Sequence, residues 1–347
     1  MPGVDRTNYR IELNLVAKTL GLSTRGNVEA SIINHCRSQL AEWIKVNGCP
    51  NTLTKLLDLF AASLDMQFVE IYGDDDLNNL LKEIPPVKEP IMARLPFELD
   101  DSTDAVTICR SKCEPWERRF LAVLNCRSWH FKRVFFTKWH EIAHRIIAGQ
   151  QLRLAFRKTS VNHAEPQEIL VDRVAGELAF YPSIFRPAVE QELSTSGRLT
   201  FDGADRVRQQ IAPEASLQST VIACLRYCQQ PVWFIICVMG YKRELQRKLT
   251  AGQGHLLPLP QPKLRVRDSG CSPAASDLGI TLYRNMRVPD SSIVTKAFGD
   301  DYALTHTGRE RLEQWQISSS GPIGQGTIEV EAFKRDNEVW AILCMDN

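Results

Sequence analysis

The sequence has no excess of charge of one sign. Its 347 residues include 42 lysines and arginines against 41 aspartates and glutamates, which gives a formal net charge of +1. Proteins that bind nucleic acid or an anionic membrane through their overall field carry a large basic excess. The composition therefore does not indicate a protein that works through such a field, and a local basic face is left open.

Long apolar runs are also missing. The most apolar stretch, PVWFIICVMGY at residues 231–241, is shorter than the roughly 20 residues that a membrane-spanning helix needs. The first residues, MPGVDRTNYRIELNL, carry charges throughout and lack the apolar core of a signal peptide. We therefore expect a cytoplasmic protein with no membrane partner.

The ten cysteines lack the regular spacing of a secreted disulfide framework. Four of them lie in apolar runs, namely Cys224, Cys228, Cys237 and Cys344. Cys109 and Cys113 have metal-ligand spacing, but no second cysteine pair stands at a suitable distance. With 44% hydrophobic residues, the chain is long enough for two or three domains with cores of their own. We expect a globular protein with reduced thiols packed in its cores.

The first half of the sequence alternates between helical and strand patterns. Apolar residues at helical spacing in residues 27–64 are interrupted by NGCPNT, which predicts two helices with Asn51 or Thr52 at the start of the second. MQFVEIYG (66–73) is strand-like. AVTICRS (105–111) and RRFLAVLN (118–125) indicate two strands of a small antiparallel sheet.

The second half begins helical and ends β-rich. DGADRVRQQIA and SLQSTVIACLRYC predict two helices before the strand-like PVWFIICVM, and AGQGHLLPLPQPK (251–263) has the prolines and glycines of a linker. The strands expected after it are KLRVRDSG, ITLYRNMRV and DDYALTH, followed by a hairpin of TIEVEAF and EVWAILCM with KRDN as its turn.

One helical segment carries a pattern with chemical meaning. Residues 128–148 contain neither glycine nor proline, and within them FFTKWHEIAHRII places His140, Glu141 and His144 among apolar residues. Residues four apart lie on one face of a helix, so both imidazoles can bind one tetrahedral zinc. Glu141 beside them can act as general base on a water that zinc makes acidic. The alternative is an exposed helical turn with two satisfied histidines, which the apolar neighbours disfavour.

A second helix supplies a third ligand candidate. EPQEILVDRVAGELAFYP (165–182) is predicted to start at Pro166, and Glu168 lies on its apolar stripe. An acid facing the core needs a partner: zinc is one, and an ion pair with Arg173 or a surface position is the alternative. Asp172, one turn later, can accept a hydrogen bond from the non-ligating nitrogen of one histidine.

These residues resemble the ImmA/IrrE family of zinc metallo-endopeptidases. The family pattern is HExxH on one helix and a ligand glutamate that begins an E-x-x-[AC]-N-x-x-A-x-x-L-L-x-P helix. The chain matches it at His140, Glu141, His144, Glu168, Ala175 and, with one inserted residue, Pro182. It departs at Val171, at Asp172 in place of asparagine, and at FFTKW in place of R-F-T-L-A. An aspartate at that position is similar to the E-x-x-x-D arrangement of thermolysin-like gluzincins.

The resemblance implies a domain plan and an α+β fold class. It implies a mainly helical, gluzincin-like metalloprotease domain with a small antiparallel sheet at residues 1–190. A helical, helix-turn-helix-like segment at 191–250, a linker at 251–262 and a C-terminal GAF-like α/β domain at 263–347 follow. The GAF-like domain would be a sensor for a small-molecule signal.

The resemblance also implies a function. Zn²⁺, with Mn²⁺ as the alternative ion, would be held by His140, His144 and Glu168, and Glu141 would be the catalytic base of a hydrolase. The substrate would be a helix-turn-helix repressor of the XRE type, whose cleavage derepresses stress-response or mobile-element genes. Tyr181, His163 and Arg173 are near the site in sequence, but each is equally well explained as structural, so no oxyanion stabiliser is assigned.

Two other functions are left open by the residues themselves. The chain could be a transcriptional regulator or stress sensor that acts by DNA or protein binding and has a structural metal site. The segment at 191–250 has few cations on its second helix, only Arg226, which favours a docking role over direct DNA binding. The chain could also be a binding module without a metal.

Overall fold

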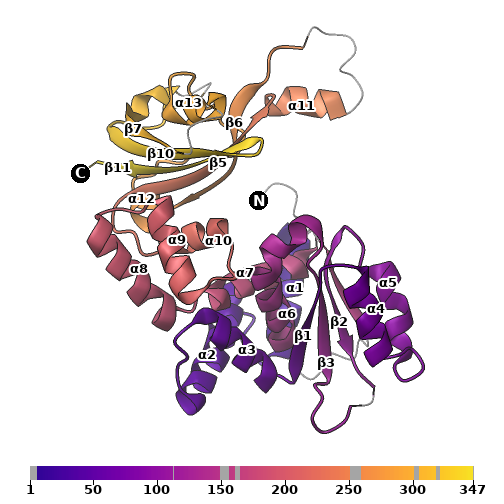
Figure 1. Ribbon diagram of the computed structural model, residues 1–347. Coiled ribbons are helices and arrows are strands. Elements are labelled where there is room, and N and C mark those ends of the chain that lie inside the picture. Colours follow the sequence, from indigo (N-terminus) through magenta and orange to yellow (C-terminus); the bar gives the residue numbers. More distant parts are fainter. Residues whose placement is uncertain are drawn as a thin grey trace. The chain divides into compact units, whose positions relative to one another are not determined.

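The computed structural model describes residues 6–111, 113–148, 156–160, 165–250, 259–300, 305–317 and 321–346 (Figure 1). The fold is mixed α+β, as expected from the sequence. The chain forms two compact units. The first comprises Met1–Arg186 and Arg208–Ser216, and the second comprises Pro187–Val207 and Leu217–Asn347.

Three helices open the first unit. They are α1 (Arg6–Thr19), α2 (Val28–Asn47) and α3 (Leu53–Ser63). The predicted break between the last two is confirmed, because the side chain of Thr52 accepts a hydrogen bond from the backbone N–H of Lys55 and so caps α3.

The sheet of the first unit has the strand order β1-β3-β2-β4. Its strands are β1 (Met66–Ile71), β2 (Thr103–Cys109), β3 (Phe120–Asn125) and β4 (Phe156–Ser160). Strand β2 is antiparallel to both β3 and β4, but β1 pairs with β3 in parallel. The predicted antiparallel pairing of residues 105–111 with 118–125 is confirmed, whereas the sequence predicted no partner for β1, which joins the sheet in parallel. The long connection between β1 and β2 allows the chain to pass the position that β3 later fills, so that β3 lies between β1 and β2.

That long connection covers one face of the sheet. It contains α4 (Asp74–Glu83), a 3-10 helix (Pro90–Arg94) and α5 (Leu95–Glu98). Leu77, Leu80 and Leu95 from it are buried with Val106, Ile108, Leu121 and Val123 of the strands. Because strand side chains alternate between faces, the residues between these point to the opposite face, where α3 and α6 pack.

Helix α6 (Val134–Ala148) and helix α7 (Pro166–Ala179) pack against each other in this unit. The sequence predicted one helix from residue 128, but Ser128–Arg133 is a 3-10 helix before α6 begins. Pro166 stands in the first turn of α7 as predicted, where its missing N–H leaves no helical hydrogen bond unmade.

The second unit is built on a five-stranded antiparallel sheet in the order β6-β5-β11-β10-β7. The strands are β5 (Val232–Gly240), β6 (Lys263–Cys271), β7 (His306–Arg311), β10 (Thr327–Arg335) and β11 (Glu338–Met345). The predicted C-terminal hairpin is confirmed as β10 and β11.

Helices and short elements complete this part of the chain. They are α8 (Pro182–Ser196), α9 (Phe201–Ile211), α10 (Leu217–Leu225), α11 (Arg243–Thr250), α12 (Pro273–Asp277), α13 (Ile293–Gly299), a 3-10 turn (Leu312–Gln314) and the two-residue strands β8 (Gln316–Ile317) and β9 (Gly321–Pro322). Phe201 of α9 packs edge-on against Phe234 and Phe333 of the sheet.

The observed units differ from the expected domain boundaries. Strand β5 was assigned to a helical segment ending at residue 250, but it pairs with β6 and β11. An apolar strand with Val232 to Cys237 all buried needs neighbours on both edges, so it joins the later strands. The expected linker falls mostly at residues 251–258, outside the described residues.

Two expected strands also differ. Residues 280–288 form only an isolated bridge between Arg265 and Arg287, although Leu282, Met286 and Val288 are buried in the core. Burial alone explains their apolar pattern. Residues 301–304 of DDYALTH lie outside the described residues, and β7 starts at His306.

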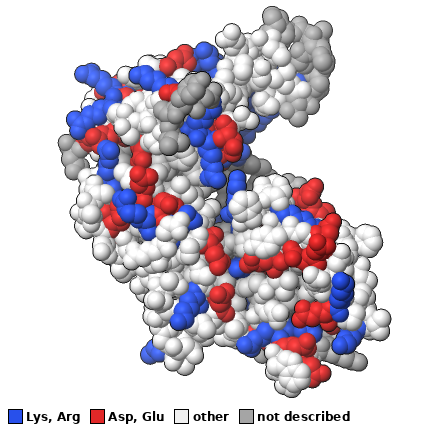
Figure 2. Space-filling model, in the orientation of Figure 1, with Lys and Arg blue, Asp and Glu red and all other residues white. Residues whose placement is uncertain are grey.

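The surface and the cysteines agree with the composition. On the face seen in Figure 2, acidic and basic side chains are interspersed and neither sign covers it. All ten cysteines are free thiols, and Cys224, Cys228, Cys237 and Cys344 are buried as predicted. Among the described helices, none is both long and apolar enough to cross a membrane.

Candidate metal centre

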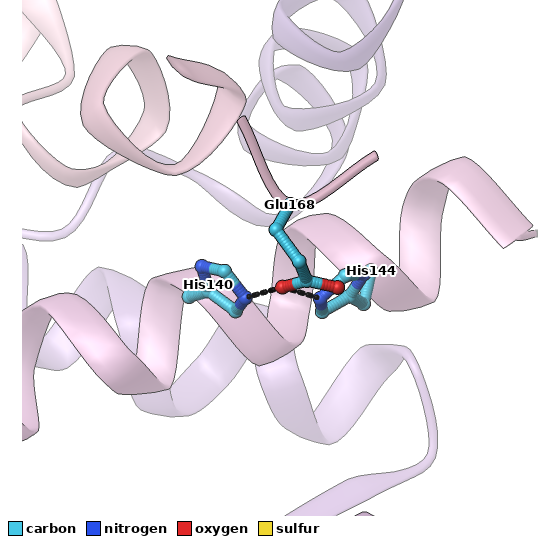
Figure 3. A group of neighbouring side chains, drawn as sticks. All are labelled: His140, His144 and Glu168. Atoms are coloured by element: carbon cyan, nitrogen blue, oxygen red, sulfur yellow. Dashed lines mark hydrogen bonds and ion pairs between the residues drawn. The ribbon is translucent and has the colours of Figure 1, made fainter. Parts of the chain in front are cut away.

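Helices α6 and α7 bring the three predicted ligands together. His140 and His144 stand one turn apart on α6, and both are only 2% exposed. Glu168 extends from the first turn of α7 towards the space between the two rings (Figure 3). Its side chain is 14% exposed, so the group lies at the edge of the core.

The distances between these groups suit a small metal ion. Nε2 of His140 lies 3.0 Å and Nε2 of His144 lies 3.2 Å from the same Oε2 of Glu168 (Figure 3). Zinc holds nitrogen and oxygen ligands at about 2.0–2.2 Å, so the edges of its tetrahedron measure about 3.3–3.6 Å. The observed separations are within a few tenths of an ångström of that range. This is the one such group of metal-binding side chains in the described part of the chain.

Asp172 lies where the sequence predicted it, one turn after Glu168. Its Oδ1 is 2.8 Å from Nδ1 of His140. Because a carboxylate can only accept, Nδ1 carries a proton in this hydrogen bond, and Nε2 is the ring atom that would bind a metal ion in place of its own proton. Such a carboxylate behind a histidine ligand fixes the ring and raises its basicity.

The electrostatic surroundings favour positive charge at this point. Burial by itself would lower the pKa of His140, but the hydrogen bonds to Asp172 and Glu168 and the nearby charge of Glu141 outweigh it and raise the pKa to about 9. Three carboxylates therefore surround two imidazoles. A divalent cation satisfies the same excess of negative charge that otherwise holds a proton.

Glu141, the residue after His140, is buried against the sheet, and it is close enough to His140 for its charge to raise the pKa of that ring. It is 1% exposed, and its Oε2 accepts a hydrogen bond of 2.7 Å from the hydroxyl of Thr107 on β2. Thr107 did not stand out in the sequence. The signal was present, since it is a hydroxyl residue in a strand whose neighbours are apolar.

The packing around the ligands is apolar and tight. Trp139, Ile142, Ala143 and Ile146 of α6 are all at most 3% exposed. The ring of Phe136 is half-buried and lies 6.5 Å from that of His140. Charges in such surroundings interact more strongly than in water, so the carboxylates would attract a cation more strongly here than at the surface.

Lys138 was not singled out from the sequence as a functional residue. Its ammonium is nearly buried on α6 and lies 2.7 Å from Glu70 of β1 and 3.2 Å from Glu214. Glu214 belongs to Arg208–Ser216, a segment that is part of the first unit although the residues before and after it belong to the second. Lys138 therefore joins α6 to two segments that are distant from it in the sequence.

The other residues near the motif have structural contacts. Arg173 pairs with Glu29 of α2 and lies over the ring of Tyr9 at 5.9 Å, so it braces helices. His163 lies outside the described residues.

Neither a scan against protein-family models nor a search of curated proteins finds a match for this chain. The site's own geometry and the motif residues therefore carry the functional argument.

Proposed function

We propose that the chain is a zinc-dependent endopeptidase. The single observation that carries the proposal is the convergence of two imidazole nitrogens and one carboxylate oxygen, from residues spaced as HExxH and a later glutamate. Zinc bound there would supply Lewis-acid polarisation of a peptide carbonyl and of water. Manganese is the alternative ion, but two nitrogen ligands favour zinc.

The chain's own residues divide the remaining tasks. His140, His144 and Glu168 would hold the ion, and Asp172 would keep His140 in the tautomer that presents Nε2. Glu141 would take a proton from the attacking water and pass it to the departing amine. Its hydrogen bond to Thr107 and its burial restrict rotation of the Glu141 side chain.

The substrate and setting follow from the resemblance to the ImmA/IrrE family. We propose a cytoplasmic regulatory metalloprotease that cleaves an XRE-type helix-turn-helix repressor and thereby relieves transcription of stress-response or mobile-element genes. The first unit, with its gluzincin-like HExxH helix, would be the protease. The sheet of the second unit would be a GAF-like sensor of a small-molecule signal.

The test incubates the purified protein, loaded with zinc, with candidate XRE-type repressors. Mass spectrometry of the products should show one cleavage. Glu141→Gln should retain zinc and lose cleavage, His144→Ala should lose both, and Glu165→Gln, an exposed acid before α7, should behave as the wild type.

Cleavage by Glu141→Gln at the wild-type rate would refute the proposed mechanism. Salt-dependent, sequence-selective DNA binding that persists in both site variants, with no cleavage by the wild type, would instead identify a regulator with a structural metal site. A gel shift with the same preparations measures this.

A further inference from the structure

Strand β2 contains a buried polar residue on the face that meets α6. Thr107 is 4% exposed, and its strand neighbours Val106 and Ile108 point into the opposite apolar core. Valine has almost the same shape as threonine and would bury no polar atom. A hydroxyl in such a place costs free energy unless it is hydrogen-bonded.

The partner of this hydroxyl is Glu141, 34 residues later in the chain. Thr107 Oγ1 donates to Glu141 Oε2 over 2.7 Å, a length typical of a charge-assisted hydrogen bond. Both side chains are excluded from bulk water. The bond is therefore stronger than one at the surface and limits rotation of the carboxylate.

The backbone that carries Thr107 is itself held on both sides. Strand β2 is an inner strand, and Thr107 faces Ala122 of β3 and Arg157 of β4 in the two ladders. A proton acceptor fixed by an inner strand keeps its position more accurately than one whose only constraint is its own flexible side chain.

We infer that Thr107 is a positioning residue for Glu141, which orients the carboxylate that accepts the proton. The inference rests on the proposed peptidase function. It goes beyond it by assigning a role to a sheet residue outside the HExxH motif. Thr107 would act only through Glu141 and would contact neither the metal ion nor the substrate.

The test measures binding of acetohydroxamate, a small zinc ligand that gives up its hydroxyl proton, to the zinc-loaded full-length protein by calorimetry. A neighbouring carboxylate that receives this proton strengthens binding. Thr107→Val should weaken binding about tenfold, as expected for loss of a hydrogen bond to a charged group. Thr107→Ser, which keeps the hydroxyl, should stay within about twofold of the wild type, and all variants should retain one zinc.

The second measurement uses as substrate the intact repressor that the wild-type protein is found to cleave. Thr107→Val should lower kcat about tenfold and leave KM unchanged, since the hydroxyl would not touch the substrate. A Thr107→Val protein that binds acetohydroxamate and cuts like the wild type would overturn the inference. So would a Thr107→Val protein that loses zinc or its fold, since the hydroxyl would then be structural.

The two proposals fail separately. If Glu141→Gln also binds acetohydroxamate like the wild type and the wild type cuts no repressor, the proposed function itself is wrong. If Glu141→Gln is impaired and Thr107→Val is not, only the role of Thr107 is wrong.

Discussion

The polar residues of the centre have identifiable hydrogen-bond partners. Asp172 holds Nδ1 of His140, Glu168 lies between the two Nε2 atoms, and Thr107 holds Glu141. In apolar packing, an unmade hydrogen bond of this kind costs about 1–3 kcal/mol. The side chains therefore have little freedom, which would reduce the free-energy cost of binding the proposed metal ion.

Asp172→Ala should weaken zinc binding about 10- to 100-fold, because the His140 ring loses the hydrogen bond that sets its tautomer and its direction. The dissociation constant is measured by competition with a chromophoric chelator. Asp75→Ala, an exposed acid on α4, is the matched control and should bind as the wild type. Equal affinity in Asp172→Ala and wild type would show that the hydrogen bond does not support the metal.

The sequence predicted the four residues that contact one another in the candidate centre, because each is a polar residue on an otherwise apolar helix. They are His140, His144, Glu168 and Asp172. The sequence did not reveal Thr107 or Lys138. Thr107 has no helical spacing relative to the motif, and its role depends on which strand face meets α6. Lys138 is adjacent to the motif, but its partner Glu214 is 76 residues away.

Three different faces of helix α6 contact three different parts of the first unit. His140 and His144 face α7, Glu141 faces β2, and Lys138 faces β1 and the segment with Glu214. Because successive residues are separated by about 100° around the helix axis, adjacent residues reach different elements. A substitution on one face that shifts α6 would therefore also shift His140 and His144.

Lys138→Met should destabilise the protein by about 1–2 kcal/mol at pH 7, because Glu70 and Glu214 lose their partner while solvent still reaches them. The ammonium and Tyr72 outweigh burial and hold the pKa of Glu70 below its usual value of 4.5. A depressed folded-state pKa contributes stability above the unfolded value that is lost as the pH falls.

The difference between Lys138→Met and the wild type should therefore shrink when the pH drops below about 4.5. Denaturant unfolding at pH 7 and pH 4 measures it, with the exposed Lys55→Met as the control. A difference that stays constant with pH would show that lost packing, not the ion pair, is responsible.

The elements themselves were largely predictable. Helices α2, α3, α7, α9 and α10 and strands β1, β2, β3, β5, β6, β10 and β11 match sequence patterns. The parallel pairing of β1 with β3 and the membership of β5 in the C-terminal sheet were not predictable. Periodicity states which residues are buried, but strand partners depend on chain crossings that leave no local signal.

Zinc should stabilise one unit of the molecule and not the other, because all three of its proposed ligands lie in the first unit. Binding to the folded state alone suppresses opening of the segments that form the site. Hydrogen exchange with mass spectrometry, with zinc and with a chelator, should show slower exchange in α6 and α7 and no change in the β10–β11 hairpin. Equal slowing of both would show that the two units open together.

The second unit has a well-filled core on one face of its sheet. Trp233, Trp315, Leu312 and Val294 are each at most 1% exposed there. These side chains form the apolar core of the C-terminal sheet.

The sequence alone was enough to propose a metal centre and its ligands. HExxH is a local helix pattern, and a glutamate and aspartate four apart on a second helix are another, so both could be read without a fold. Only the tertiary structure decided that Glu168 meets both histidines, that Asp172 meets His140, and that Glu141 is held by a strand. Those contacts join residues 24 to 34 positions apart, and the packing of α6 between α7 and the sheet sets them.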